Sequence, residues 1–184
     1  LALTFGGPAG AQESERITLL STSDLHAHLY PYDYFGGKEA ELGLAKVATL
    51  VRQARMEDPD ALLLDAGDTI QGTPLAYYHY RIEPTEQNPI ILAMNRLGYD
   101  AMTVGNHEFN FGSDILEKAH RQSAFPWLAA NLVRASDGQP VYQPWVIFER
   151  HGIRIGVLGL ITKNVPAWER PDHIRGLRFD DSVE

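Results

Sequence analysis

Three apolar segments of this chain each end in a group of polar side chains, and this pattern constrains the fold more than any other feature. The segments are 17–26, 61–68 and 101–112. Short apolar runs of this kind are typical of strands buried in a sheet. In open α/β sheets, the loops at the carboxyl ends of the strands build the functional site. We therefore expect the polar residues of the three strand ends to converge: Asp24, His26, Asp68, Asn106 and His107.

The five side chains offer carboxylate, imidazole and amide groups, and the 184-residue chain contains no cysteine. Oxygen and imidazole ligands suit Mn, Mg, Fe, Co or Zn in a catalytic centre better than a structural zinc, which usually has thiolate ligands. The sequence thus predicts a catalytic metal site at the strand ends.

Each of these residues also has a purely structural interpretation. Asp24 and Asp68 could accept hydrogen bonds from nearby backbone N–H groups in turns, and Asn106 could occupy a left-handed turn. Glu108 could turn inward to bind backbone or orient a ligand, or serve only the fold. The sequence alone leaves these alternatives open.

Strands and helices alternate through the first two thirds of the chain. A strand at 16–23, expected to be covered on both faces, precedes an amphipathic helix at 42–56 and a second strand at 61–65. Such a β-α-β unit has a right-handed connection. The next expected helix begins with Asn88 as N-cap and Pro89 at its first position, and Gly98 follows its end.

The last third of the chain predicts a different arrangement. Ser113 is expected to cap a helix that runs to about Gln122, and 127–132 is expected to form one strand. The segments 144–150 and 153–161 read as an antiparallel hairpin joined at His151-Gly152. The remaining histidines have no partners nearby in sequence, and we expect them at the surface: His79, His120, His151 and His173.

The formal net charge of −8 and the absence of basic clusters argue against a nucleic-acid polymer as partner. Residues 1–11 resemble the end of a signal peptide, with the small residues Ala9-x-Ala11 before a cleavage point and a linker at 12–15. The alternative is a disordered tail. No other stretch approaches the roughly 20 apolar residues of a transmembrane helix. We expect a periplasmic or secreted protein.

The motifs Asp24-x-His26, Gly67-Asp68 and Gly105-Asn106-His107-Glu108 together resemble the signature of the calcineurin-like metallophosphoesterases. The resemblance is strongest to the exported 5′-nucleotidases and 2′,3′-cyclic-nucleotide 2′-phosphodiesterase/3′-nucleotidases. It implies an α/β (α+β) class, with a four-layer fold in which helices flank a mixed β sandwich. It also implies two divalent metal ions (Mn, Co, Zn, Fe or Mg) and a nucleotide substrate.

The resemblance assigns a role to each matched position. Asp24 and His26 would bind one metal ion, Asp68 would bridge both, and Asn106 would bind the second. His107 would face the substrate, where it would stabilise the phosphoryl oxygens or protonate the leaving oxygen.

Asn110 distinguishes between branches of the family. The 5′-nucleotidases usually have an acid here, which keeps the catalytic histidine charged, whereas an amide can only orient it. Asn110 favours the cyclic phosphodiesterase/3′-nucleotidase branch. The alternatives are a 5′-nucleotidase or UDP-sugar hydrolase and, from another class, a non-catalytic binding protein or inactive fragment.

The family's further ligand motifs, which contain Gly-His, do not occur in the 184 residues. We therefore expect 16–184 to be the N-terminal part of a metallophosphoesterase domain, incomplete at its C-terminus. The remaining ligands and a C-terminal nucleotide-binding domain would lie in the missing part of the same protein. The chain alone is expected to be inactive.

Overall fold

The computed structural model describes residues 15–83 and 87–183. The expected signal-peptide remnant at 1–11 and most of the linker at 12–15 lie outside these residues.

A four-stranded parallel sheet forms the centre of the described chain, in the order β1-β4-β5-β6. Its strands are β1 Leu19–Thr22, β4 Leu62–Asp65, β5 Ala101–Thr103 and β6 Trp127–Leu128. All three pairings in this sheet are parallel. Because the strands run in the same direction, their carboxyl ends lie along the same edge.

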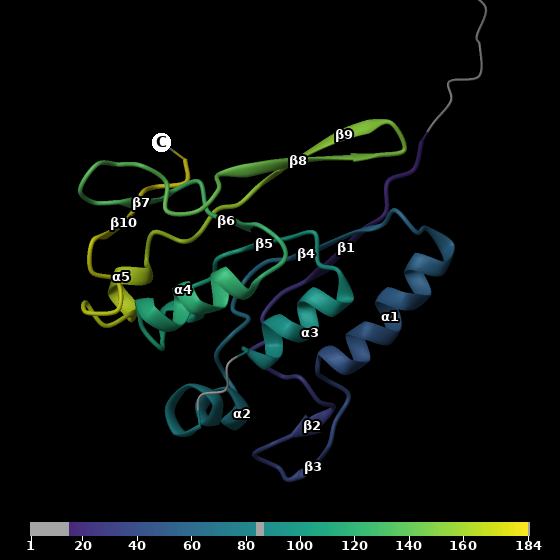
Figure 1. The fold of residues 1–184 in the computed structure, drawn as a ribbon, viewed down its shortest axis with the longest axis horizontal. Helices are drawn as coiled ribbons and strands as arrows, with labels where there is room; N and C mark the ends of the chain where they lie inside the picture. Colours follow the sequence, from purple (N-terminus) through teal and green to yellow (C-terminus); the bar gives the residue numbers. More distant parts are fainter. Residues whose placement is uncertain (1–14, 84–86, 184) are drawn as a thin grey trace, which may run out of the picture.

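Helices cover one side of this sheet. The helical elements are α1 Leu44–Glu57, α2 Pro74–Tyr77, η1 Tyr78–Ile82, α3 Pro89–Leu97, η2 His107–Phe109, α4 Ser113–Gln122 and α5 Val165–Trp168. In Figure 1, α1, α3 and α4 lie on one side of the parallel strands, and the β8–β9 ribbon lies on the other. The largest fully buried side chains include Leu63, Ile91, Met94, Met102 and Trp127.

The other described strands pair in twos, all antiparallel. β2 Tyr32–Asp33 pairs with β3 Lys38–Glu39, β7 Leu132–Arg134 with β10 Leu177–Phe179, and β8 Trp145–Arg150 with β9 Ile153–Leu158. The predicted hairpin is confirmed. His151 and Gly152 both have positive φ, 52° and 74°. A two-residue turn requires such values if its twist is to match that of the two strands.

The predicted ends of α3 are also confirmed. The Asn88 side chain accepts hydrogen bonds from the backbone N–H groups of Ile90 and Ile91, and Gly98 ends the helix with φ 66°. The prediction for α4 is wrong in one detail. Its N-cap is Gly112, and Ser113 is the first helical residue.

Two strand predictions need correction. The first strand is not covered on both faces: Leu19 and Ser21, which share one face of β1, are exposed, Leu19 at 57%. The segment 127–132 is not one strand, because the N–H of Ala130 bonds the carbonyl of Gly159 instead of continuing the sheet. Asn131 then bonds the backbone of Ile161, and the chain leaves toward β7.

The surface prediction fails for three of the four histidines. His79 is buried on η1, and His120 packs against the rings of Trp127 and Tyr142. His173 pairs with Glu169 at 3.0 Å, its side chain only 14% exposed. Only His151 stays exposed, at the hairpin turn. Spacing along the chain carries no signal for these long-range contacts.

No helix among the described residues is long and apolar enough to cross a bilayer.

Candidate metal centre

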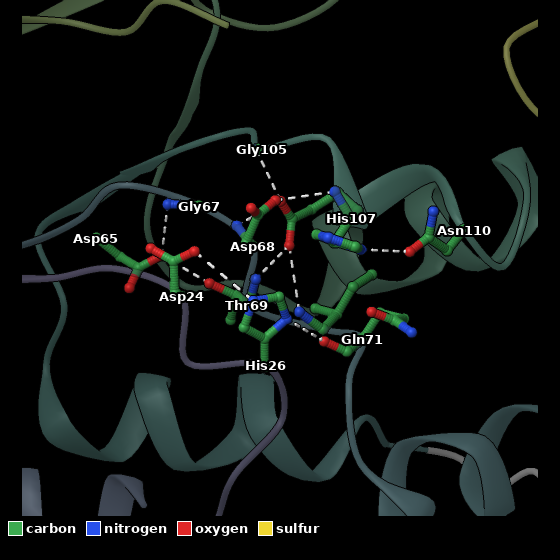
Figure 2. A network of polar contacts seen from close by, with 12 residues as sticks. Asp24, His26, Asp65, Gly67, Asp68, Thr69, Gln71, Gly105, His107 and Asn110 are labelled. Atoms are coloured by element: carbon green, nitrogen blue, oxygen red, sulfur yellow. Dashed lines mark hydrogen bonds and ion pairs between the residues drawn. The ribbon is translucent and has the colours of Figure 1, made fainter. Parts of the chain in front are cut away.

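The loops that follow β1, β4 and β5 meet at the carboxyl edge of the parallel sheet. His26, Asp68 and His107 each contribute one ligand atom to a cluster in which all three atoms lie within 4.8 Å of one another. Figure 2 shows their side chains gathered together, with Asn110 on the far side of His107. The sequence predicted that the strand ends converge, and the structure brings these three residues together.

Backbone hydrogen bonds hold the first loop against the second. The N–H groups of Asp24, His26 and Ala27 bond the carbonyls of Gly67, Asp68 and Thr69 at 3.0, 2.9 and 2.8 Å. The four non-glycine residues with positive φ in these loops are Asp24, His26, Ala27 and Asp68. Such conformations cost about 1–3 kcal/mol each and persist where the surroundings enforce them, often at functional sites.

Glycines allow the loops to approach so closely. A Cβ on Gly105 would lie 2.3 Å from the Asp68 Oδ1 atom, and one on Gly67 would lie 2.5 Å from the backbone nitrogen of Gly105. A Cβ on Gly72 would lie 2.5 Å from the Cβ of His26. Larger residues at these positions would push the candidate ligands apart.

Glu108 is a buried carboxylate beneath the site. Its Oε1 accepts backbone hydrogen bonds from Thr69 and Ile70, and its Oε2 accepts from Asp68 and Gly105. Burial raises the pKa of Glu108, and the Asp68 charge adds to this, while the N–H donors of Thr69, Asp68 and Gly105 act in the opposite direction. The inward orientation considered for Glu108 is therefore observed, and the residue joins the second loop to the third.

The hydrogen bonds of His26 fix its tautomer. Its Nδ1 lies 3.0 Å from the backbone carbonyl of Gln71. A carbonyl oxygen only accepts, so Nδ1 carries a proton, and in the neutral ring Nε2 keeps a lone pair. Nε2 lies 3.6 Å from the Asp24 carboxylate. His26 is thus prepared to bind a cation through Nε2.

Asp68 connects the candidate ligands through both its backbone and its side chain. Its Oδ1 accepts a hydrogen bond from the backbone N–H of His107 at 2.8 Å. Asn106, which directly precedes His107, has φ −76°. The left-handed turn considered for Asn106 is therefore wrong. Its ligand role stays a prediction.

The carboxylates of the site, Asp24 and Asp68, have no lysine or arginine partner in an ion pair among the described residues, 15–83 and 87–183. Two carboxylates beside an imidazole lone pair suit a divalent cation. The residues present therefore fit a metal ion.

His107 is held from its other side. Its Nδ1 lies 2.7 Å from the Oδ1 atom of Asn110. With Nδ1 engaged in this way, Nε2 is the ring nitrogen left to face a substrate or a metal ion. The predicted pairing of His107 with Asn110 is thus present, although the catalytic role of each is untested.

Sequence reasoning missed two buried acids near the site. Asp65, at the end of β4, accepts hydrogen bonds from the hydroxyls of Thr22 and Thr69 and from the N–H of Gly67, and burial raises its pKa. Glu169 accepts a hydrogen bond from the Asn110 amide. Asp65 could have been suspected from its place at a strand end, but no local signal links Glu169 to Asn110, 59 residues away.

The family model of the calcineurin-like phosphoesterases matches residues 17–183. The chain belongs to this family. The predicted resemblance and the α/β metallophosphoesterase fold class are confirmed, and the enzyme class of phosphoric ester hydrolases is confirmed at the level of the family.

Individual relatives support the same assignment. The chain is 36% identical over 96% of its length to the trifunctional nucleotide phosphoesterase protein YfkN of Bacillus subtilis. It is 34% identical over its full length to a 2′,3′-cyclic-nucleotide 2′-phosphodiesterase/3′-nucleotidase of Yersinia enterocolitica. It spans 13% and 30% of the length of these two proteins.

A solved structure of a putative 5′-nucleotidase from Staphylococcus aureus is similar in fold, with a TM-score of 0.83 and 30% identity. The match covers 90% of the chain and 32% of that protein. The family's relatives thus include proteins named for both branches that the sequence considered.

Proposed function

We propose that the chain carries metal-binding and catalytic residues of a phosphoester hydrolase that acts on nucleotides with two divalent metal ions. Its reactions would be those of a 2′,3′-cyclic-nucleotide 2′-phosphodiesterase and 3′-nucleotidase, in nucleotide salvage. The observation that carries the proposal is the convergence of His26, Asp68 and His107 within 4.8 Å. The Ala9-x-Ala11 pattern supports a periplasmic or secreted location.

The ligands to the metal ions would be His26 through Nε2, together with Asp24, Asp68 and Asn106. Bound divalent metals lower the pKa of water and polarise phosphoryl oxygens. The exposed carboxylate of Asp24, 64% accessible, would then bind at the open side of the site. His26 would bind through its imidazole ring, which the hydrogen bond to the Gln71 carbonyl holds in place.

His107 would act on the phosphate group. Its backbone is fixed on Asp68 and its ring on Asn110, so that Nε2 is left free for the substrate. From there the ring would stabilise a phosphoryl oxygen or donate a proton to the leaving oxygen. Asn110 would hold the ring in this orientation.

The presence of an amide at position 110 supports the cyclic phosphodiesterase/3′-nucleotidase branch, and the Yersinia relative carries that name. The second candidate is a 5′-nucleotidase or UDP-sugar hydrolase, which the similarity to the Staphylococcus structure supports. From another class, a non-catalytic binding protein or an inactive fragment remains the alternative to test.

The test uses the complete open reading frame that encodes the chain. The protein is stripped with a chelator and reloaded with Mn, Co, Zn or Mg, and hydrolysis of 2′,3′-cyclic AMP, 3′-AMP and 5′-AMP is followed. We expect metal-dependent hydrolysis of the first two substrates and its loss in His107→Ala. His151→Ala, which removes an exposed histidine at the hairpin turn, is the matched control.

The other outcomes separate the alternatives. Hydrolysis of 5′-AMP alone would keep the metal-dependent chemistry and move the protein to the 5′-nucleotidase branch. No hydrolysis with any metal would favour the binding protein.

A further inference from the structure

A buried carboxylate lies behind the His107–Asn110 pair. The Oε2 atom of Glu169, the residue that follows α5, accepts a hydrogen bond from the Asn110 Nδ2 atom at 2.5 Å. Its Oε1 accepts from the N–H of Arg170 at 2.7 Å and lies 3.0 Å from the Nδ1 atom of His173. The Glu169 side chain is only 6% exposed. Its two oxygens therefore have different partners, and only one of them serves Asn110.

The chemistry of these groups gives the hydrogen bonds a direction. A carboxylate only accepts hydrogen bonds, so the NH₂ group of Asn110 must face Glu169. The carbonyl oxygen of Asn110 then faces His107, and the His107 Nδ1 atom must donate to it. The neutral ring then has its lone pair on Nε2. The form that donates from Nε2 to a phosphoryl or leaving oxygen is the ring protonated at both nitrogens, whose Nδ1–H still needs the acceptor that Asn110 provides.

An asparagine alone could not enforce this arrangement. The two ends of an amide have nearly the same shape, and a flipped Asn110 would present NH₂ to His107 instead. The ring would then have to accept at Nδ1 and carry its proton on Nε2. Glu169 prevents the flip, because the flipped amide would place its carbonyl oxygen against a carboxylate.

We propose that Glu169 is a positioning residue that sets the tautomer and orientation of His107 through the amide of Asn110. The inference rests on the catalytic role of His107 in the proposed function. Glu169 does not touch the substrate in this arrangement. By fixing the orientation of the Asn110 amide, Glu169 keeps the Asn110 carbonyl oxygen against His107 Nδ1 as an acceptor. An asparagine that is free to flip would not do so.

The first test is the tautomer of His107 in the metal-free protein, read from ¹⁵N–¹H correlation spectra of ¹⁵N-histidine-labelled samples. In the wild type we expect the Nδ1–H form of His107. In Glu169→Gln the isosteric side chain can donate as well as accept, so both Asn110 orientations are allowed and we expect a mixture. His26 is an internal reference, because the Gln71 carbonyl fixes its tautomer independently. Glu149→Gln, the same change on the exposed face of β8, is the matched control.

The second test is a kinetic cycle with Asn110→Asp, made in the complete open reading frame. We expect Glu169→Gln to lower kcat about 10- to 100-fold with little change in KM, as for other residues that orient a catalytic group. In the Asn110→Asp background, either carboxylate oxygen can accept from His107 without help. There we expect Glu169→Gln to leave kcat unchanged or to raise it. The introduced glutamine can donate a hydrogen bond to the introduced aspartate, whereas the native Glu169 would repel it.

The outcomes distinguish this inference from the proposed function. If the wild type hydrolyses no nucleotide, the proposed function fails, while the tautomer measurement still tests the positioning role. If the wild type is active, an unchanged His107 tautomer or an equal loss of kcat in both backgrounds overturns the inference. Should Glu169→Gln fold poorly, Glu169→Asp replaces it. The shorter acid cannot keep its bonds to Arg170 and His173 and also reach Asn110, so we expect the same mixture of tautomers.

Discussion

The backbone N–H of His107 donates a 2.8 Å hydrogen bond to the carboxylate of Asp68. The same aspartate accepts, at its own carbonyl, the N–H of His26 at 2.9 Å. Asp68 therefore lies between the two histidines of the cluster and is bonded to the backbone of both. A shift of the Asp68 loop would move both imidazoles relative to its carboxylate.

Replacing Gly105 by alanine is expected to weaken metal binding about 10- to 100-fold. The new Cβ would lie 2.3 Å from the Asp68 Oδ1 atom and 2.5 Å from its backbone nitrogen, so the Asp68 loop must move. Isothermal titration of Mn²⁺ into the metal-free protein measures the effect. Gly156→Ala is the control, because a Cβ on Gly156 meets nothing within 4 Å. Equal affinities for the two variants would contradict the prediction.

Glu108→Gln is expected to lower the free energy of unfolding by at least about 2 kcal/mol, because a buried donor left without a partner costs about 1–3 kcal/mol. Each oxygen of Glu108 accepts backbone N–H groups, so the NH₂ of glutamine must face two donors in either orientation. Urea denaturation measures the loss, with Glu149→Gln as control. A stability equal to the wild type would mean that the loops relax around the amide.

The sequence contained enough information for the strand ends and their convergence. Apolar runs ending in polar residues predicted β1, β4 and β5, and a parallel sheet places such ends on one edge. The caps of α3 followed from Asn88 and Gly98, because capping depends on local residues. The contact between Asn110 and Glu169 has no local cause, since it depends on where the chain returns after the β8–β9 hairpin. Burial of His79 likewise depends on tertiary packing that periodicity does not encode.

Removal of the metal is expected to destabilise the protein. His26→Ala is expected to abolish most of the difference in stability between the metal-loaded and the metal-free protein. A ligand at about 100 times its Kd stabilises the folded state by about 2.7 kcal/mol. Thermal melting with excess Mn²⁺ and with chelator measures the difference. His120→Ala is the control, because this histidine packs on Trp127 and Tyr142 and not in the cluster. A metal-dependent gain that survives in His26→Ala would show that the ion binds elsewhere.

Acidification through the range below about pH 6.5 is expected to destabilise the fold through His79 and His120. Burial lowers the pKa of both side chains. Lys118 acts in the same direction on His79, and Arg121 does so on His120, where Glu117 opposes it. Below the pKa that these two histidines have in the unfolded chain, the unfolded chain binds protons that the folded protein does not bind. The free energy of unfolding therefore falls as the pH falls, and the stabilising contribution is fully present only above that pKa.

Urea denaturation at about pH 5.5 and about pH 7.5 measures this dependence. The His79→Gln/His120→Gln variant should show a smaller loss on acidification than the wild type. His151→Gln is the comparison, because it removes a histidine that lies 3.4 Å from the Asp58 carboxylate, and it should not reduce the loss. Asp65 and Glu108, whose pKa values burial raises, contribute the opposite slope, because the folded state then retains protons that the unfolded chain releases. That slope is common to all variants and cancels in the comparison. An identical loss in the double variant and the wild type would assign the acid sensitivity to other groups.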